Sequence, residues 1–174
     1  VLVIDMDPQF NVSQYMLGIK RYKQINDAEE PTIWDIFEQY TQTPGVKKET
    51  VDLKKCVHTV IEFVGKSRID IIPSRLELAF SLRNPAQKET LVSQFVSKIE
   101  ENYDLIFVDC PPTESLFTTA AYLASDYILV PVKPEFLSTI GLPLLSSSLK
   151  EFHTRYEGHN IEVAGIVFNA ATDY

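Results

Sequence analysis

Cysteine and long apolar runs are both scarce in this sequence of 174 residues. Its two cysteines, Cys56 and Cys110, are too few for a disulfide framework or a cysteine metal cage, so a reducing cytoplasm is the expected location. We expect both to be small buried residues without redox or metal chemistry. No apolar run approaches about 18 residues, so no membrane span is expected.

Basic residues are also in the minority. There are 16 Lys and Arg against 24 Asp and Glu, a formal net charge of −8. Such an excess of acid makes these residues a poor nucleic-acid binder by themselves. The hydrophobic content of 45% is ordinary for a globular protein, and the length fits a single domain.

Short runs of apolar, β-forming residues predict the strands of a sheet that is covered on both faces, as parallel sheets are. The predicted strands are Val1–Ile4, Ile69–Ile72, Leu105–Val108, Tyr127–Val130 and Val163–Phe168.

Helical patterns separate these strands. Four helices are predicted: Thr32–Tyr40, a second that has Asn84 as N-cap and ends at Ile99, Ser115–Ala124, and Leu137–Tyr156. The last is expected to bury a stripe formed by Ile140, Leu144, Leu145, Leu149 and Phe152. Residues 41–67 show no clear pattern and receive no predicted structure. The alternation of strands and helices predicts an α/β domain with a mostly parallel sheet.

Carboxylates follow two of the predicted strands: Asp5 and Asp7 come after the first, and Asp109 after the third. Ligands of such sheets bind beyond the carboxyl ends of the strands. Mg²⁺ prefers oxygen ligands, and one or two carboxylates suffice when phosphates and waters complete its shell. An isolated Asp after a strand is more often a turn former or a helix cap. Two such sites together favour Mg²⁺-dependent phosphate chemistry.

Four blocks of the sequence resemble the ParA/Soj-type partition ATPases, of the deviant Walker A class that includes MinD. Residues 1–11 (VLVIDMDPQFN) resemble switch I, and residues 103–112 (YDLIFVDCPP) resemble the Walker B strand and switch II. Residues 126–142 resemble the next strand and helix, and residues 71–79 match a smaller block. The resemblance implies a P-loop NTPase fold of three layers, α/β/α, with residues 1–174 as one nucleotide-binding domain that is incomplete at both ends.

The resemblance also implies a role for each matching residue. Asp7 would orient the water that attacks the γ-phosphate of ATP. Asp5 would lie nearer the Mg²⁺ shell, and Asp109 would hold Mg²⁺ through water. The remaining nucleotide-binding positions would be Gln9, Asn11, Pro111, Pro112 and Asn169, the last of them against the adenine.

The sequence departs from the family pattern at three places. Phe10 stands where relatives often carry Gly, and is expected to pack between subunits or to change how switch I moves. Thr113 and Glu114 replace small residues and add a negative charge to switch II. No G-x-x-x-x-G-K-[ST] stretch occurs in the 174 residues, whereas the family's phosphate-binding loop would precede Val1. We therefore expect the natural protein to extend beyond both ends, and these residues alone not to hydrolyse ATP.

The function implied by the resemblance is that of an ATPase in plasmid or chromosome segregation. Such an ATPase uses ATP and Mg²⁺, forms an ATP-dependent homodimer, binds DNA non-specifically and is stimulated by a ParB-like protein. It would be cytoplasmic and associated with the nucleoid. Three alternatives remain open: a non-catalytic ParA-like binding or regulatory protein, a MinD-like ATPase, and a cellulose-synthesis-associated ATPase.

Overall fold

The computed structural model describes residues 1–40, 52–65, 67–85, 87–134 and 138–170. The chain divides into two compact units, Val1–Ala124 and Ser125–Tyr174. The expectation of a single nucleotide-binding domain over the whole chain stays a prediction. None of the described helices is long and apolar enough to cross a membrane.

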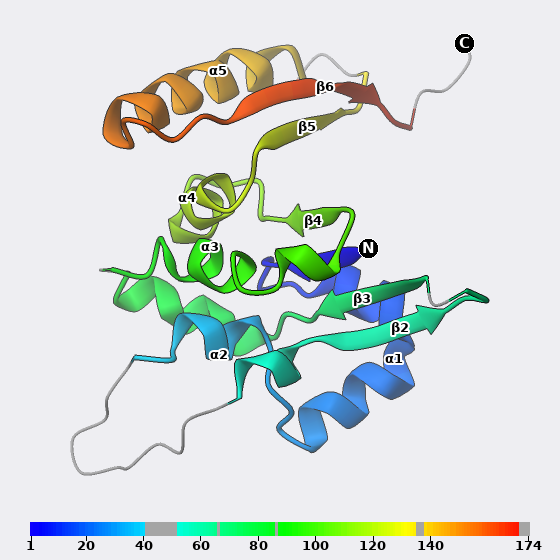
Figure 1. The fold of residues 1–174 in the computed structure, drawn as a ribbon. Coiled ribbons are helices and arrows are strands. Elements are labelled where there is room, and N and C mark those ends of the chain that lie inside the picture. Colours follow the sequence, from blue (N-terminus) through cyan, green and yellow to red (C-terminus); the bar gives the residue numbers. More distant parts are fainter. Residues whose placement is uncertain (41–51, 66, 86, 135–137, 171–174) are drawn as a thin grey trace. The chain divides into compact units, whose positions relative to one another are not determined.

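A four-stranded sheet forms the centre of the first unit (Figure 1). Its strands are β1 (Leu2–Asp5), β2 (His58–Glu62), β3 (Arg68–Ile72) and β4 (Ile106–Asp109), in the order β2-β3-β1-β4. β1 runs parallel to both β3 and β4, and β2 pairs antiparallel with β3. The mostly parallel sheet is thus confirmed. β2 falls in residues 41–67, for which no structure was predicted.

Helices cover both faces of this sheet. Side chains alternate along a strand, so neighbouring residues of β1 reach opposite faces. Leu2 and Ile4 pack into the larger core, and Val3 packs against the smaller one. The larger core is built by α2 (Ile33–Phe37), α3 (Leu91–Val96) and α4 (Leu116–Leu123), and the smaller one by α1 (Asn11–Asp27). The predicted three layers are therefore present in this unit.

The helix predicted from Asn84 begins later than expected. α3 starts at Leu91, because Gln87 has a positive φ of 64° and interrupts any helix before it. Next to it, Lys88 turns inward, and its Nζ lies 2.7 Å from Oε1 of Glu38 in a buried ion pair. The described residues of this unit also form three 3₁₀ helices: η1 (Leu53–Cys56), η2 (Leu76–Arg83) and η3 (Glu100–Asn102).

The second unit contains β5 (Tyr127–Val132), α5 (Ser138–Arg155) and β6 (Glu162–Phe168). β5 and β6 pair in parallel, as two strands joined through a helix can, and all three elements match predictions. The predicted core stripe of α5 is wrong at Leu144, which is 64% exposed. Two strands offer a helix only a narrow face, so Phe152 is buried while Leu145 and Leu149 are partly buried. The side chain of Ile140 lies outside the described ones.

Candidate active site

Three strand ends meet at one edge of the first sheet. In the parallel pair of β1 and β4, Asp5 lies directly opposite Asp109, and the Met6 amide donates a hydrogen bond of 2.7 Å to the Asp109 carbonyl oxygen. On the other side of β1, Ile4 pairs with Ile72, the last residue of β3. The edge predicted to collect Asp5, Asp7 and Asp109 therefore exists.

Asp5 faces inward at this edge and is fully buried. Its Oδ2 accepts hydrogen bonds from the Ser13 hydroxyl at 2.7 Å and the Ser13 amide at 2.8 Å, and its Oδ1 accepts one from the Asp7 amide at 3.1 Å. Burial raises the pKa of Asp5, and the bonds from Ser13 oppose that rise. Both carboxylate oxygens are thus occupied within the chain, so Asp5 holds the loop that follows β1.

Asp7 lies in that loop and is only partly buried. Its Oδ1 accepts a hydrogen bond of 2.9 Å from the Gln9 amide, and its carbonyl oxygen accepts one of 2.9 Å from the Phe10 amide. These bonds make a tight turn that ends where α1 begins at Asn11. Gln9 and Asn11 are exposed beside it.

Asp109, the last residue of β4, is the third carboxylate of the group, and its side chain is exposed to solvent. Partial burial, followed by the negative charges of Asp5 and Asp7, raises the pKa of Asp109 to about 6. The negative charges of Asp5 and Asp7 add to the effect of burial, and a bound cation would offset them.

The described residues contain no cluster of three or more His, Cys, Asp and Glu that could cage a metal ion. A nucleotide-bound Mg²⁺ needs no such cage, since phosphates and waters supply most of its ligands. Asp109 fits that requirement by its exposure, whereas the oxygens of the buried Asp5 already accept three hydrogen bonds within the chain, and its place near Mg²⁺ stays a prediction.

The segment after β4 carries the predicted switch II residues. Pro111 is partly buried and Pro112 is exposed, as are Thr113 and Glu114. Burial, with smaller effects from the charges of Asp109 and Asp7, raises the pKa of Cys110 to about 11. Cys56 is buried as expected, whereas Cys110 is only partly buried. The expected lack of redox and metal chemistry at both stays a prediction.

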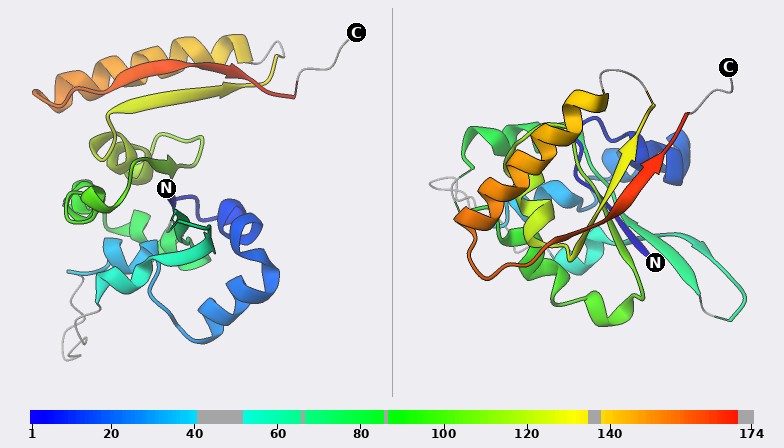
Figure 2. Two further views of the ribbon diagram at one scale, coloured as in Figure 1. Left: turned by 45° about the vertical axis from the view of Figure 1, so that its right-hand side comes forward. Right: turned by 90° about the horizontal axis from the view of Figure 1, so that it is seen from above.

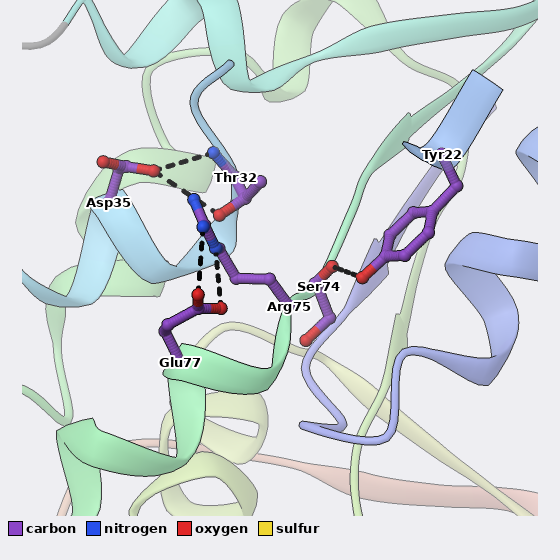
Figure 3. A network of polar contacts seen from close by, with 6 residues as sticks. All are labelled: Tyr22, Thr32, Asp35, Ser74, Arg75 and Glu77. Atoms are coloured by element: carbon purple, nitrogen blue, oxygen red, sulfur yellow. Dashed lines mark hydrogen bonds and ion pairs between the residues drawn. The ribbon is translucent and has the colours of Figure 1, made fainter. Parts of the chain in front are cut away.

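Three further residues hold the site together and were missed from the sequence. The Ser74 amide donates to the Ser13 hydroxyl at 2.8 Å, and the Tyr22 hydroxyl donates to the Ser74 carbonyl oxygen at 3.0 Å (Figure 3). Ser13 in turn bonds Asp5, so the loops after β1 and β3 are joined by one chain of buried hydrogen bonds. The only signal for this was the position of Ser74 in a block that resembles the family.

Asn169 lies in the second unit, directly after β6. Its amide donates to the Val132 carbonyl oxygen at 2.9 Å, and its Oδ1 accepts from the Ala170 amide at 2.8 Å. The side chain therefore takes part in its own turn, and contact with adenine stays a prediction.

A family model described as an AAA domain matches residues 1–163. Solved structures with the same fold include a plasmid partition protein from Borrelia burgdorferi, with a TM-score of 0.72 and 20% identity over 99% of this chain and 66% of that one. Another is cobyrinic acid a,c-diamide synthase from Mycobacterium smegmatis with a bound ATP analogue and magnesium, with a TM-score of 0.71 and 17% identity over 95% of this chain and 60% of that one. The fold and the family match define an AAA-domain protein of the P-loop NTPase type.

Similar curated proteins identify the family within this class. An uncharacterized protein of Methanocaldococcus jannaschii is 32% identical over 97% of this chain and 60% of its own length. The sporulation initiation inhibitor protein Soj of Bacillus subtilis is 29% identical over 67% of this chain and 51% of its own length. The virulence plasmid ParA family protein pGP5-D of Chlamydia psittaci is 30% identical over 97% of this chain and 56% of its own length. The chain belongs to the ParA/Soj-type ATPase family. It spans 51–60% of the length of these curated relatives.

Proposed function

We propose that this chain forms most of the nucleotide-binding domain of a ParA-type ATPase that acts in the partition of DNA. The observation that carries the proposal is the in-register placement of Asp5 opposite Asp109, with Asp7 on the loop that Asp5 holds. The printed descriptions of a ParA family protein of a virulence plasmid and of a plasmid partition protein support the partition role.

In the proposed site each of the three carboxylates has a different role. Mg²⁺, when bound with ATP, supplies positive charge against the phosphates. Asp109 would hold the ion through water, because a nearby cation would favour the charged form of this exposed carboxylate. Asp7 orients the attacking water, and Asp5 fixes the Asp7 amide. The nucleotide is further contacted by Gln9, Asn11, Pro111, Pro112 and Asn169.

A phosphate-binding loop from outside this sequence completes the proposed site. The 174 residues contain no G-x-x-x-x-G-K-[ST] stretch. Among the described strands, β4 pairs with β1 alone, so its second edge is available to a further parallel strand. Phosphoryl transfer depends on positioning and charge neutralisation, so the 174 residues without that loop do not turn over ATP.

The remaining parts of the proposal concern the whole protein. It dimerises around ATP, binds DNA non-specifically at the nucleoid in the cytoplasm, and is stimulated by a ParB-like partner. The support for these parts is the family membership.

The test is the substitution Asp7→Asn in the natural protein. Asn retains an oxygen for the Gln9 amide and removes only the charge, so the loop is preserved. We expect ATP binding to stay within about twofold and turnover to fall by about 100-fold, the usual contribution of a group that manages a proton or a water. Asp104→Asn, on the exposed turn before β4, is the matched control and leaves turnover unchanged.

Unchanged turnover in Asp7→Asn would show that the carboxylate of Asp7 takes no part in ATP hydrolysis. A natural protein that binds ATP but shows no turnover at all would favour the non-catalytic, regulatory alternative.

A further inference from the structure

Phe10 adopts a backbone conformation that a bulky residue rarely takes. Its φ of 47° and ψ of 30° are left-handed, a region that Gly enters freely and Phe enters only when its surroundings hold it there. Its ring is stacked on that of Tyr22, with the ring centres 5.3 Å apart and the planes 17° from parallel. The partner of Phe10 is therefore within its own chain.

A break in α1 makes this stack possible. Residues 10 and 22 would be about 18 Å apart along the axis of a straight α-helix. Gly18, with φ 73° and ψ 151°, is not helical and divides α1 into two arms, which Figure 2 shows in blue. The second arm turns back, so that Tyr22 reaches Phe10. No atom would obstruct a Cβ at Gly18, so the positive φ alone favours glycine there.

Tyr22 is itself firmly placed. It is 5% exposed and belongs to the buried cluster formed with Leu17, Ile25 and Ile71. Its hydroxyl donates to the Ser74 carbonyl oxygen, as seen in Figure 3. The Ser74 amide also donates to Ser13, which donates to Asp5. The two ends of the loop over residues 5–10 are therefore connected to the same chain of buried hydrogen bonds.

We propose that Phe10 and Tyr22 form an aromatic clasp that positions the loop carrying Asp7 and Gln9. The stack and the Tyr22 hydrogen bond restrain the end of the loop at which Phe10 lies, and Asp5 restrains its start. Phe10 and Tyr22 are positioning residues, since the proposal has them act through the loop that carries Asp7. Their effect on hydrolysis rests on the proposed function, whereas the clasp itself can be tested without nucleotide.

The first experiment is hydrogen exchange of the natural protein, followed in peptides that cover residues 5–13. In Phe10→Asn the left-handed backbone is kept, because Asn tolerates it, but the ring is lost. We expect exchange in these peptides to become about 3- to 10-fold faster, the size expected for losing one aromatic pair. Phe10→Tyr keeps the ring and restores slow exchange.

Two references separate a local from a global effect. Tyr15→Ala removes another aromatic ring from α1, one that is 91% exposed, and leaves exchange in residues 5–13 unchanged. Exchange in β3 stays at the wild-type rate in Phe10→Asn. Faster exchange in β3 as well, or an unchanged rate in residues 5–13, overturns the clasp.

The second experiment measures ATP hydrolysis by the same variants. Phe10→Asn is expected to lower kcat about 3- to 10-fold with KM for ATP within about twofold, because a poorly held Asp7 affects the chemical step. An unchanged kcat together with faster loop exchange overturns the positioning role and leaves the clasp. A wild-type protein without ATPase activity overturns the proposed function and the positioning role together, and hydrogen exchange alone then decides the clasp.

Discussion

The substitution Asp109→Asn should stabilise the first unit at neutral pH. Asp109 becomes charged only against partial burial and the nearby charges of Asp5 and Asp7, which raise its pKa to about 6. In the unfolded chain its pKa returns to the ordinary value near 3.8. Between these two values the folded state binds more protons than the unfolded state, so stability falls as the pH rises. Asn imitates the neutral acid and removes this loss.

The expected gain follows from the size of the shift. A rise from 3.8 to about 6 corresponds to about 3 kcal/mol if it is expressed in full. Because the side chain is exposed at the edge of the sheet, solvent screening reduces this, and we expect about 1 kcal/mol at pH 7. At pH 3.5 Asp109 is largely neutral in both states, so the gain should vanish there.

Urea unfolding followed by the fluorescence of Trp34 measures this directly. Trp34 is the single tryptophan of the sequence, and it packs against the core of the first unit, so its emission reports that unit. Asp104→Asn removes an exposed carboxylate near β4 and serves as control. A gain of equal size at pH 3.5 and pH 7, or a loss at pH 7, would refute the raised pKa of Asp109 in the folded state.

Two further substitutions test the packing that supports the site. Lys88→Met leaves the buried carboxylate of Glu38 without its 2.7 Å ion-pair partner and should cost about 3 kcal/mol of unfolding free energy, most of which Glu38→Gln in the same chain should recover. Phe117→Ala empties a 1% exposed core position and removes an edge-to-face contact with Phe37, whose ring centre is 5.4 Å away, so about 3–5 kcal/mol should be lost. The same urea titrations measure both, and a loss below about 1 kcal/mol in either would contradict the burial of that side chain.

The strand framework of the site could be predicted from sequence because its signals are local. The strands β1 and β4 are short apolar runs that end in Asp5 and Asp109, and Asp7 follows two residues after Asp5. Parallel strands end at a common edge, so the meeting of Asp5 and Asp109 follows from topology alone. The antiparallel strand β2 lacked such a signal, because its residues at the edge of the sheet are mostly polar or only partly buried.

The parts that escaped prediction depend on contacts between distant residues. α1 has no regular apolar stripe, since Gly18 breaks it into two arms that bury different faces. The inward turn of Lys88, just before α3, depends on Glu38, 50 residues earlier. Such pairings are decided by the folded arrangement, and no local pattern encodes them.

The different environments of Asp5 and Asp7 illustrate the same limit at the scale of two residues. In the sequence they are equivalent carboxylates around Met6, and the family resemblance assigned Asp5 to the Mg²⁺ shell. In the structure Asp5 is the better-bonded group, because Ser13, eight residues later, returns a hydroxyl and an amide to it. Asp5 is fully buried and accepts three hydrogen bonds within the chain, whereas the partly buried Asp7 keeps access to solvent. A place for Asp5 near Mg²⁺ stays a prediction. Ser13, in the first turn of α1, thus gives the two carboxylates different surroundings, and the proposed role in hydrolysis falls to the more accessible Asp7.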